Sequence, residues 1–291
     1  METIESRVAR RKTLDGVFAI LGLFSTFVCM ITLAALMVDL AIDGAERIKG
    51  HFFTSFPSRF PEQAGILSAW VGTTLVMLVT AATAVPLGVA AGVYLEEYAP
   101  KNWLTALIEI NIANLAGVPS IVYGLMALGL FVYQLRLGQS VLTAGLTLTL
   151  LILPIVIVAT REATRAVPGT IREAAYALGA TKWQTVKDHV LPYSTGGILT
   201  GVIIALSRAI SETAPLITIG ALTFIAFLPS PPLKGKFPYL SFEWLMAPFT
   251  VMPIQMFNWV SRPQQEFHLN AAAAGLILMV MTLTMNGLAI Y

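Results

Sequence analysis

The chain has 291 residues, of which 56% are hydrophobic and 12% charged, and its mean hydropathy is +0.77. Soluble domains carry about twice this charged fraction, so composition excludes a soluble globular protein and indicates a membrane protein. The formal net charge of +2 is too small to predict nucleic-acid binding. The single cysteine, Cys29, excludes an internal disulfide framework and a multi-cysteine metal site.

Six apolar runs are each long enough to cross about 30 Å of hydrocarbon as a helix. They lack the alternation of a membrane β-barrel. We therefore predict an all-α membrane protein with six transmembrane helices, and the first run, too long for a signal peptide, is interpreted as an uncleaved anchor. The spans are residues 16–40, 67–95, 108–135, 141–160, 193–227 and 269–291, so that residues 1–15 precede the first span and residues 67–291 form a core of five spans.

Lysine and arginine indicate the orientation. With the N-terminus in the cytoplasm, the inner segments hold ten basic residues and the outer segments seven, with Arg208 inside a span. The inner ten are Arg7, Arg10, Arg11, Lys12, Lys101, Arg161, Arg165, Arg172, Lys182 and Lys187; the outer seven are Arg47, Lys49, Arg59, Arg136, Lys234, Lys236 and Arg262. The excess agrees with the positive-inside rule. It predicts a cytoplasmic N-terminus, a cytoplasmic loop at residues 161–192 and an outer loop at residues 228–268.

Four spans contain residues that weaken a straight helix. Proline frees a backbone carbonyl, which is tolerated where a neighbouring helix or a watery cavity satisfies it. The residues are Pro86, Gly88, Gly117, Pro119, Pro154, Pro215 and Gly220. Each could mark an ordinary kink or a close helix contact, but together they favour a bundle built around a path.

Residues 161–192, here called the polar insert, form a short water-soluble stretch in an otherwise apolar chain. Thr170 with Glu173 has the spacing of a capping box, which predicts a helix start, and Gly179 suits the left-handed end of that helix. Thr181 with Gln184 repeats the spacing and predicts a second short helix. The polar insert is therefore expected to present two short helices.

The exposed faces of these helices should carry Tyr176, Leu178 and Trp183, an unusual amount of apolar surface for a membrane loop. Pro192 is expected to end the second helix just before the fifth span. This pattern is typical of a docking site.

The polar insert resembles the signature loop of the permease subunits of bacterial ABC importers. The matching positions are Glu173, Ala174, Ala175, Gly179, Leu191 and Pro192, while His189 stands where the pattern prefers isoleucine. The resemblance implies a coupling loop that inserts into a cleft of a cytoplasmic ATPase subunit and transmits its motion, with a small residue such as Ala175 where the cleft closes. The alternative is that Glu173 is only a helix cap.

No nucleotide-binding motif is present in the sequence. The chain lacks G-x-x-x-x-G-K-[ST], and its only Gly-Lys pair, Gly235-Lys236, is followed by Phe237. We therefore expect a chain that is not itself an enzyme, with ATP and Mg²⁺ bound by partner ATPase subunits. The three histidines His51, His189 and His268 are scattered, which predicts neither a metal site nor another cofactor.

The fifth span contains a second candidate site. Arg208 and Glu212 are four residues apart and so lie on one helix face. Arg208 is about 15 residues past Tyr193, roughly 22 Å along the helix, where a charge costs about 2.5 to 3.5 kcal/mol. It should therefore face the bundle interior. A guanidinium can hold an oxyanion through two hydrogen bonds, with hydroxyls from Ser211 and Thr213 nearby; the alternative is a static ion pair.

The same stretch, SRAISETAPL (207–216), resembles the PstA family of phosphate importer permeases. The resemblance extends to residues 85–100, 117–125 and 249–267. It implies a permease for inorganic phosphate in the bacterial inner membrane, paired with a PstC-like permease, two PstB-like ATPase subunits and a PstS-like phosphate-binding protein. It also implies that Arg208 belongs to the phosphate path, with Glu212 as its neighbour.

Two alternatives remain open at this point. One is a permease for another oxyanion such as sulfate or molybdate. The other is a membrane scaffold or sensor subunit whose loop docks a signalling protein.

The orientation can be tested by cysteine labelling in a chain whose Cys29 is replaced by alanine. A cysteine at Lys182 should be protected from an impermeant thiol reagent added outside, and a cysteine at Lys234 should react. The reverse pattern would invert the topology.

Overall fold

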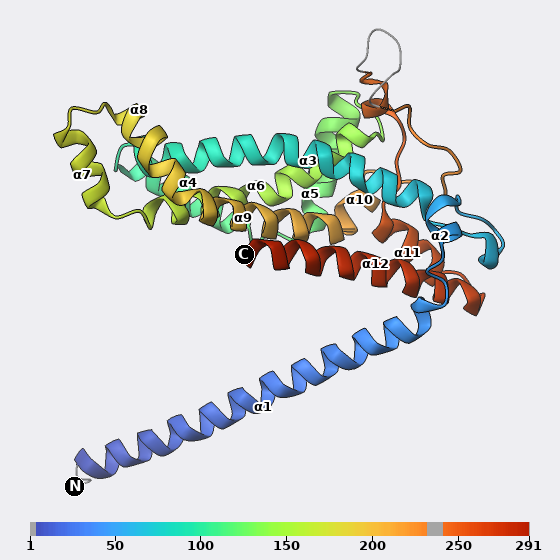
Figure 1. Ribbon diagram of the computed structural model, residues 1–291, viewed down its shortest axis with the longest axis horizontal. Helices are drawn as coiled ribbons and strands as arrows, with labels where there is room; N and C mark the ends of the chain where they lie inside the picture. The colour runs from blue at the N-terminus through green and yellow to red at the C-terminus, as the bar shows by residue number, and fades with distance from the viewer. Residues whose placement is uncertain (1–3, 232–240, 291) are drawn as a thin grey trace.

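The computed structural model describes residues 4–231 and 241–290 of the chain (Figure 1). The described residues form helices and connecting loops without strands, which confirms the all-α prediction. Five helices are long and apolar enough to cross a membrane, and a bent pair makes a sixth if it counts as one span. Lys234 and Lys236 of the outer loop, and Tyr291 at the end of the sixth predicted span, lie outside the described residues.

The bundle is elongated, with α3, α6, α9 and α12 running along its length (Figure 1). The helices of α and 3-10 type are α1 Ile4–Ala45, α2 Gly50–Thr54, η1 Pro61–Gln63, α3 Leu67–Val93, α4 Trp103–Leu115, α5 Ser120–Ala127, α6 Val141–Arg165, α7 Gly169–Ala177, α8 Lys182–Thr185, α9 Leu191–Ser211, α10 Ala214–Thr218, η5 Glu243–Met246, α11 Met252–Val260 and α12 Gln265–Ile290. Three π-helical turns are η2 Tyr94–Tyr98, η3 Leu128–Gln134 and η4 Val186–Val190. Helices α7 and α8 lie at one end of the bundle and α2 at the other.

Helix α1 contains the first predicted span and is considerably longer than it. Its side chains are exposed throughout residues 11–36, and the helix extends away from the bundle (Figure 1). Only its last turns pack on α12, where a Cβ at Gly44 would lie 2.8 Å from the backbone nitrogen of Ala273. Within residues 4–231 and 241–290, the first span is therefore a helix without a packing partner along most of its length.

The third and fifth predicted spans are not single straight helices. The third breaks after Leu115, and the helices on either side of the break meet at 104°. The fifth stops at Ser211: the backbone of Glu212 is extended, with ψ of 129°, and Pro215 lies in the first turn of the short α10. Proline cannot donate the helical hydrogen bond, and Pro119 and Pro215 each stand four residues after the last helical residue, where a continuing helix would need their missing N–H.

At the polar insert, the fourth span ends later than predicted and the fifth span begins earlier than predicted. Helix α6 continues to Arg165, five residues past the predicted end, so residues 161–165 belong to the membrane helix. Pro192 does not end the second short helix, because α8, η4 and α9 form one helical run from Lys182 to Ser211. The π turn tolerates the proline, since the Leu191 N–H donates to the Val186 carbonyl five residues back.

Helix α6 packs closely against α3 and α9 because small residues line both contacts. A Cβ at Gly92 of α3 would lie 2.6 Å from Cβ of Thr160, and one at Gly197 of α9 would lie 2.9 Å from that of Ala163. Thr80 of α3 also donates to the Gly145 carbonyl of α6 at 3.2 Å. In lipid, where apolar burial between helices gains little, such close packing and interhelical hydrogen bonds hold the helices together.

Two glycines of α9 allow this packing to be tested. Gly201→Ala would place a methyl against the Ala159 side chain of α6, so we expect a loss of roughly 1–3 kcal/mol and a lower melting temperature of the detergent-solubilised protein. Gly196→Ala is the control, because nothing lies within 4 Å of its Cβ position. Equal melting temperatures for the two variants would contradict close α6–α9 packing.

Candidate functional site

The first helix of the polar insert, α7, begins earlier than predicted. Its N-cap is Pro168, whose side chain makes no capping bond, so Thr170 lies inside the first turn and the expected Thr170–Glu173 capping box is wrong. Proline fixes its own φ, which is −56° at Pro168, and this holds the chain in the extended entry to α7 without a capping side chain. Glu173 is thereby left exposed with no hydrogen bond or ion pair in the described structure, so it is not a helix cap.

The end of α7 and the start of α8 agree with the sequence prediction. Gly179 has φ of +85°, and its N–H donates to the Tyr176 carbonyl while the Ala180 N–H donates to that of Ala175. This is the Schellman arrangement that glycine favours. Thr181 and Gln184 form the predicted capping box, with the Gln184 N–H 3.3 Å from the threonine hydroxyl.

The surface of the polar insert is strongly apolar, as predicted. Leu178 is 90% exposed and Trp183 61%, and Tyr176 is also exposed. Ala175 is buried within this chain, whose helix α7 packs against α8 and η4, so its small size also suits the chain's own packing. The other signature residues are accessible: Glu173, Ala174, Gly179 and Pro192 are exposed and Leu191 is half-buried.

Arg208 lies in a groove of about 540 Å³ between α9 and α12. Polar groups along the groove come from both helices: Ser207, Arg208, Ser211, Thr282 and Asn286. The Arg208 side chain is 47% exposed, so it does not face the interior of this chain as expected. The opposite face of α9 packs on α6, which leaves the Arg208 face open.

Glu212 is close to Arg208 but not on the same helix. Arg208 Nε lies 3.6 Å from Glu212 Oε1, and within the described residues no other carboxylate is within 4 Å of the guanidinium. Glu212 caps the end of α9, and Thr213 follows it outside the helix. The Ser211 hydroxyl donates to carbonyls of α9, and it lines the groove beside Arg208, whereas Thr213 does not. The guanidinium is thus held by one long ion pair and keeps donors available for an anion.

Sequence reasoning missed a network of charges at the polar-insert end of the bundle. The sequence alone indicates only a role in membrane orientation for Arg161, Arg165 and Arg172. In the structure, the adjacent carboxylates Glu96 and Glu97, at the end of the second span, pair with Arg165 at 2.8 Å and with Arg172 at 2.6 Å. Arg161 pairs with Glu109 of α4 at 2.8 Å. Two adjacent acidic residues beside an apolar span were the signal, since they need basic partners.

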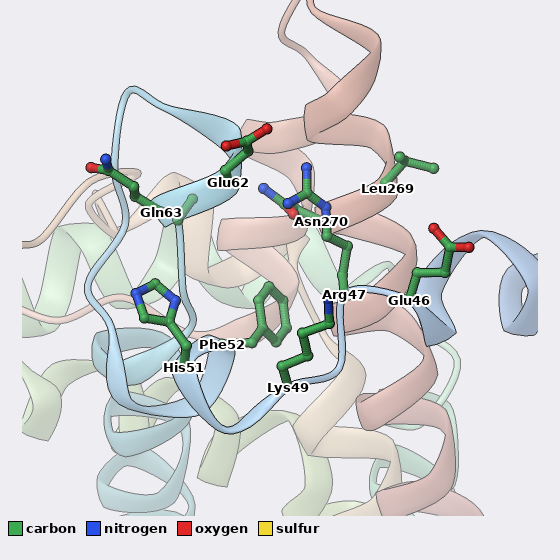
Figure 2. A pocket seen from close by; sticks show the side chains of 10 residues that line it. Glu46, Arg47, Lys49, His51, Phe52, Glu62, Gln63, Leu269 and Asn270 are labelled. Atoms are coloured by element: carbon green, nitrogen blue, oxygen red, sulfur yellow. The ribbon is translucent and has the colours of Figure 1, made fainter.

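A separate cavity of about 940 Å³ opens at the other end of the bundle, near α2 and the start of α12 (Figure 2). Charged side chains of both signs line it, and the amide of Asn270 donates to the Pro61 carbonyl at 2.8 Å. The cavity contains none of the predicted site residues. Among the described residues, no three His, Cys, Asp or Glu side chains gather as metal ligands would.

The polar insert and the Arg208 groove both lie within residues 84–289, the part of the chain that matches a known protein family. A profile of the family described as "Binding-protein-dependent transport system inner membrane component" matches residues 84–289. The chain belongs to this family. As a member, it is a multi-pass inner-membrane component of a transport system and not itself an enzyme.

Relatives of the chain include several named permeases. The probable ABC transporter permease protein YqgI of Bacillus subtilis (strain 168) is 31% identical over 89% of this chain and 90% of its own length. The phosphate transport system permease protein PstA 1 of Mycobacterium tuberculosis (strain ATCC 25618 / H37Rv) is 32% identical over 81% of this chain and 73% of its own. PstA of Yersinia pestis is 30% identical over 97% and 90%. These relatives confirm the predicted resemblance to PstA permeases.

Proposed function

We propose that the chain is the transmembrane permease subunit of an ATP-driven importer of inorganic phosphate. The observation that carries the proposal is the Arg208 guanidinium, which lies within a membrane-spanning helix and opens into a groove that also holds hydroxyl and amide side chains; among the described residues it has one ion-pair partner, at 3.6 Å. A guanidinium fork matches phosphate geometry through paired hydrogen bonds. Relatives named phosphate permeases align along most of the chain, which supports phosphate over sulfate or molybdate and over a scaffold role.

The exposure of Arg208 indicates how the path is built. A half-exposed arginine facing lipid would cost about 2.5 to 3.5 kcal/mol, so its face should be covered by protein or water. We infer that a second, PstC-like permease covers the α9–α12 groove and completes the path. Glu212 neutralises Arg208 when the path is empty, and Ser211 at the groove and Thr213 beyond α9 supply hydroxyls near the anion.

The polar insert supports coupling to an ATPase. Its exposed Leu178 and Trp183 offer an apolar surface that a cytoplasmic partner would bury. We infer two PstB-like subunits that bind ATP and Mg²⁺, a PstS-like protein that delivers phosphate from outside, and a cytoplasmic N-terminus. The continuous helix from Lys182 to Ser211 then connects the docking surface with Arg208 in one element, with roughly 39 Å of helix between Lys182 and Arg208.

The phosphate contact is tested by uptake into proteoliposomes that contain the complete complex, normalised to assembled complex. Arg208→Lys keeps the charge but removes the planar fork, so phosphate uptake should fall about tenfold or more while assembly persists. Arg208→Gln should be worse, because it leaves Glu212 without its cation in the path.

A static ion pair gives a different pattern. In that case Arg208→Lys would be nearly silent, and the double variant Arg208→Met with Glu212→Gln would recover uptake, since both charges are removed together. Uptake near the wild-type rate in the double variant would end the phosphate-contact hypothesis. Sulfate uptake exceeding phosphate uptake by the wild-type complex would favour the other oxyanion.

Docking of the polar insert is tested by Leu178→Asp. Because Leu178 is 90% exposed, the new carboxylate leaves this chain's own packing intact. In a closed ATPase cleft the same carboxylate would lose its hydration, which opposes docking. The variant should insert normally and lose the ATPase on co-purification. Gln63→Asp is the control, because Gln63 is exposed and lines the cavity near α2, at the other end of the bundle (Figure 2). Normal ATPase recovery with Leu178→Asp would show that this surface does not dock.

A further inference from the structure

We propose that Arg172 is a positioning residue that joins the docking helix α7 to the ends of α3 and α6, so that motion of α7 moves the membrane helices with it. The proposal rests on the proposed coupling to an ATPase. It concerns which contact transmits the motion of α7 to the membrane helices, which docking alone does not determine.

Arg172 binds three acceptors on two separate segments, the end of α3 and the end of α6. Its Nε and NH2 groups donate to Glu97 Oε1 at 3.1 and 2.6 Å, which reaches the π turn at the end of α3. NH2 also donates to the Thr164 carbonyl at 2.9 Å, and NH1 donates to the Val167 carbonyl at 2.7 Å. These two carbonyls lie in the last turn of α6 and just beyond it, at the negative end of the helix dipole, where a cation is favourable.

The burial of both side chains distinguishes the Arg172–Glu97 pair from a surface ion pair. The Glu97 side chain is 7% exposed and that of Arg172 20%. A carboxylate so buried requires its cation, because removing one partner leaves an uncompensated charge. The pair is therefore held in one arrangement, unlike a surface ion pair, which contributes little.

Helix α7 has no comparable attachment through its other side chains. Among the described residues, Arg172 is the only side chain of α7 that forms a hydrogen bond or an ion pair. Helix α7 packs against η4 and its Ala175 is buried, but Ala175 supplies only a methyl group. Without Arg172, α7 could tilt on the α8–α9 helix while α3 and α6 stay in place.

The neighbouring pair provides a matched comparison. Arg165 donates to both oxygens of Glu96, the residue before Glu97, at 3.1 and 2.8 Å. Arg165 is 51% exposed and belongs to α6, so this pair joins α6 with the end of α3 but does not reach α7. Glu96 also lies 3.7 Å from Arg161 Nε, another residue of α6, so of the ion pairs made by the two adjacent glutamates only that of Glu97 connects the docking helix.

The experiment compares Arg172→Met with Arg165→Met in proteoliposomes carrying the complete complex, with phosphate taken up and ATP hydrolysed measured together. We expect Arg172→Met to assemble and to lower phosphate transported per ATP roughly fivefold or more, the lower range of coupling between sites. Arg165→Met should change the ratio less than about twofold. Arg172→Lys keeps a cation for Glu97 but cannot span all three acceptors, so an intermediate ratio is expected.

Glu97→Leu provides a second route if Arg172→Met does not assemble. It removes the contact with α3 while Arg172 keeps its two carbonyls on α6, and it should lower the same ratio. A merely structural role predicts less assembled complex with an unchanged ratio. An unchanged ratio in Arg172→Met and Glu97→Leu, or an equal fall in Arg165→Met, would overturn the proposal. Absence of phosphate uptake by the wild-type complex would instead refute the proposed function.

Discussion

The close packing of α6 against α3 and α9 is the constraint on which the rest of the structure depends. Small residues at both contacts allow the helices to approach, as at Gly92 beside Thr160 and Gly197 beside Ala163. Within a bilayer there is little hydrophobic gain from bringing helices together, so dispersion contacts and hydrogen bonds between helices must hold them. Helix α6 is therefore the central element, and its neighbours take their positions from it.

The functional groups are arranged around the ends and open faces of these three helices. The last turn of α6 supplies the carbonyls that Arg172 binds, and the end of α3 supplies Glu97. Helix α9 has one face on α6, so its opposite face carries Arg208 in the open groove beside α12. The proposed docking surface and the proposed phosphate path are thus attached to the same packed helices, and packed helices can carry coupling over such a distance.

The prolines show that the local sequence does not determine where a helix breaks. Pro86 and Pro154 lie inside continuous helices, whereas Pro119 and Pro215 lie at breaks. Each proline removes one helical hydrogen bond, and whether the helix continues depends on what satisfies the freed carbonyl and on what the chain must contact next. Short α10 packs against α5, a contact that only the folded bundle creates.

The sequence by itself determined the all-α membrane class, the Gly179 turn, the Thr181 cap and the apolar surface of the polar insert, because these follow from composition and from interactions within a few residues. Family membership also rested on local motifs that the chain displays directly. Tertiary structure alone decided that Arg208 opens to a groove, that Ala175 is buried, and that Glu97 binds Arg172. Those outcomes depend on which helix faces meet, and residues 75 positions apart pair only after α3, α6 and α7 have come together.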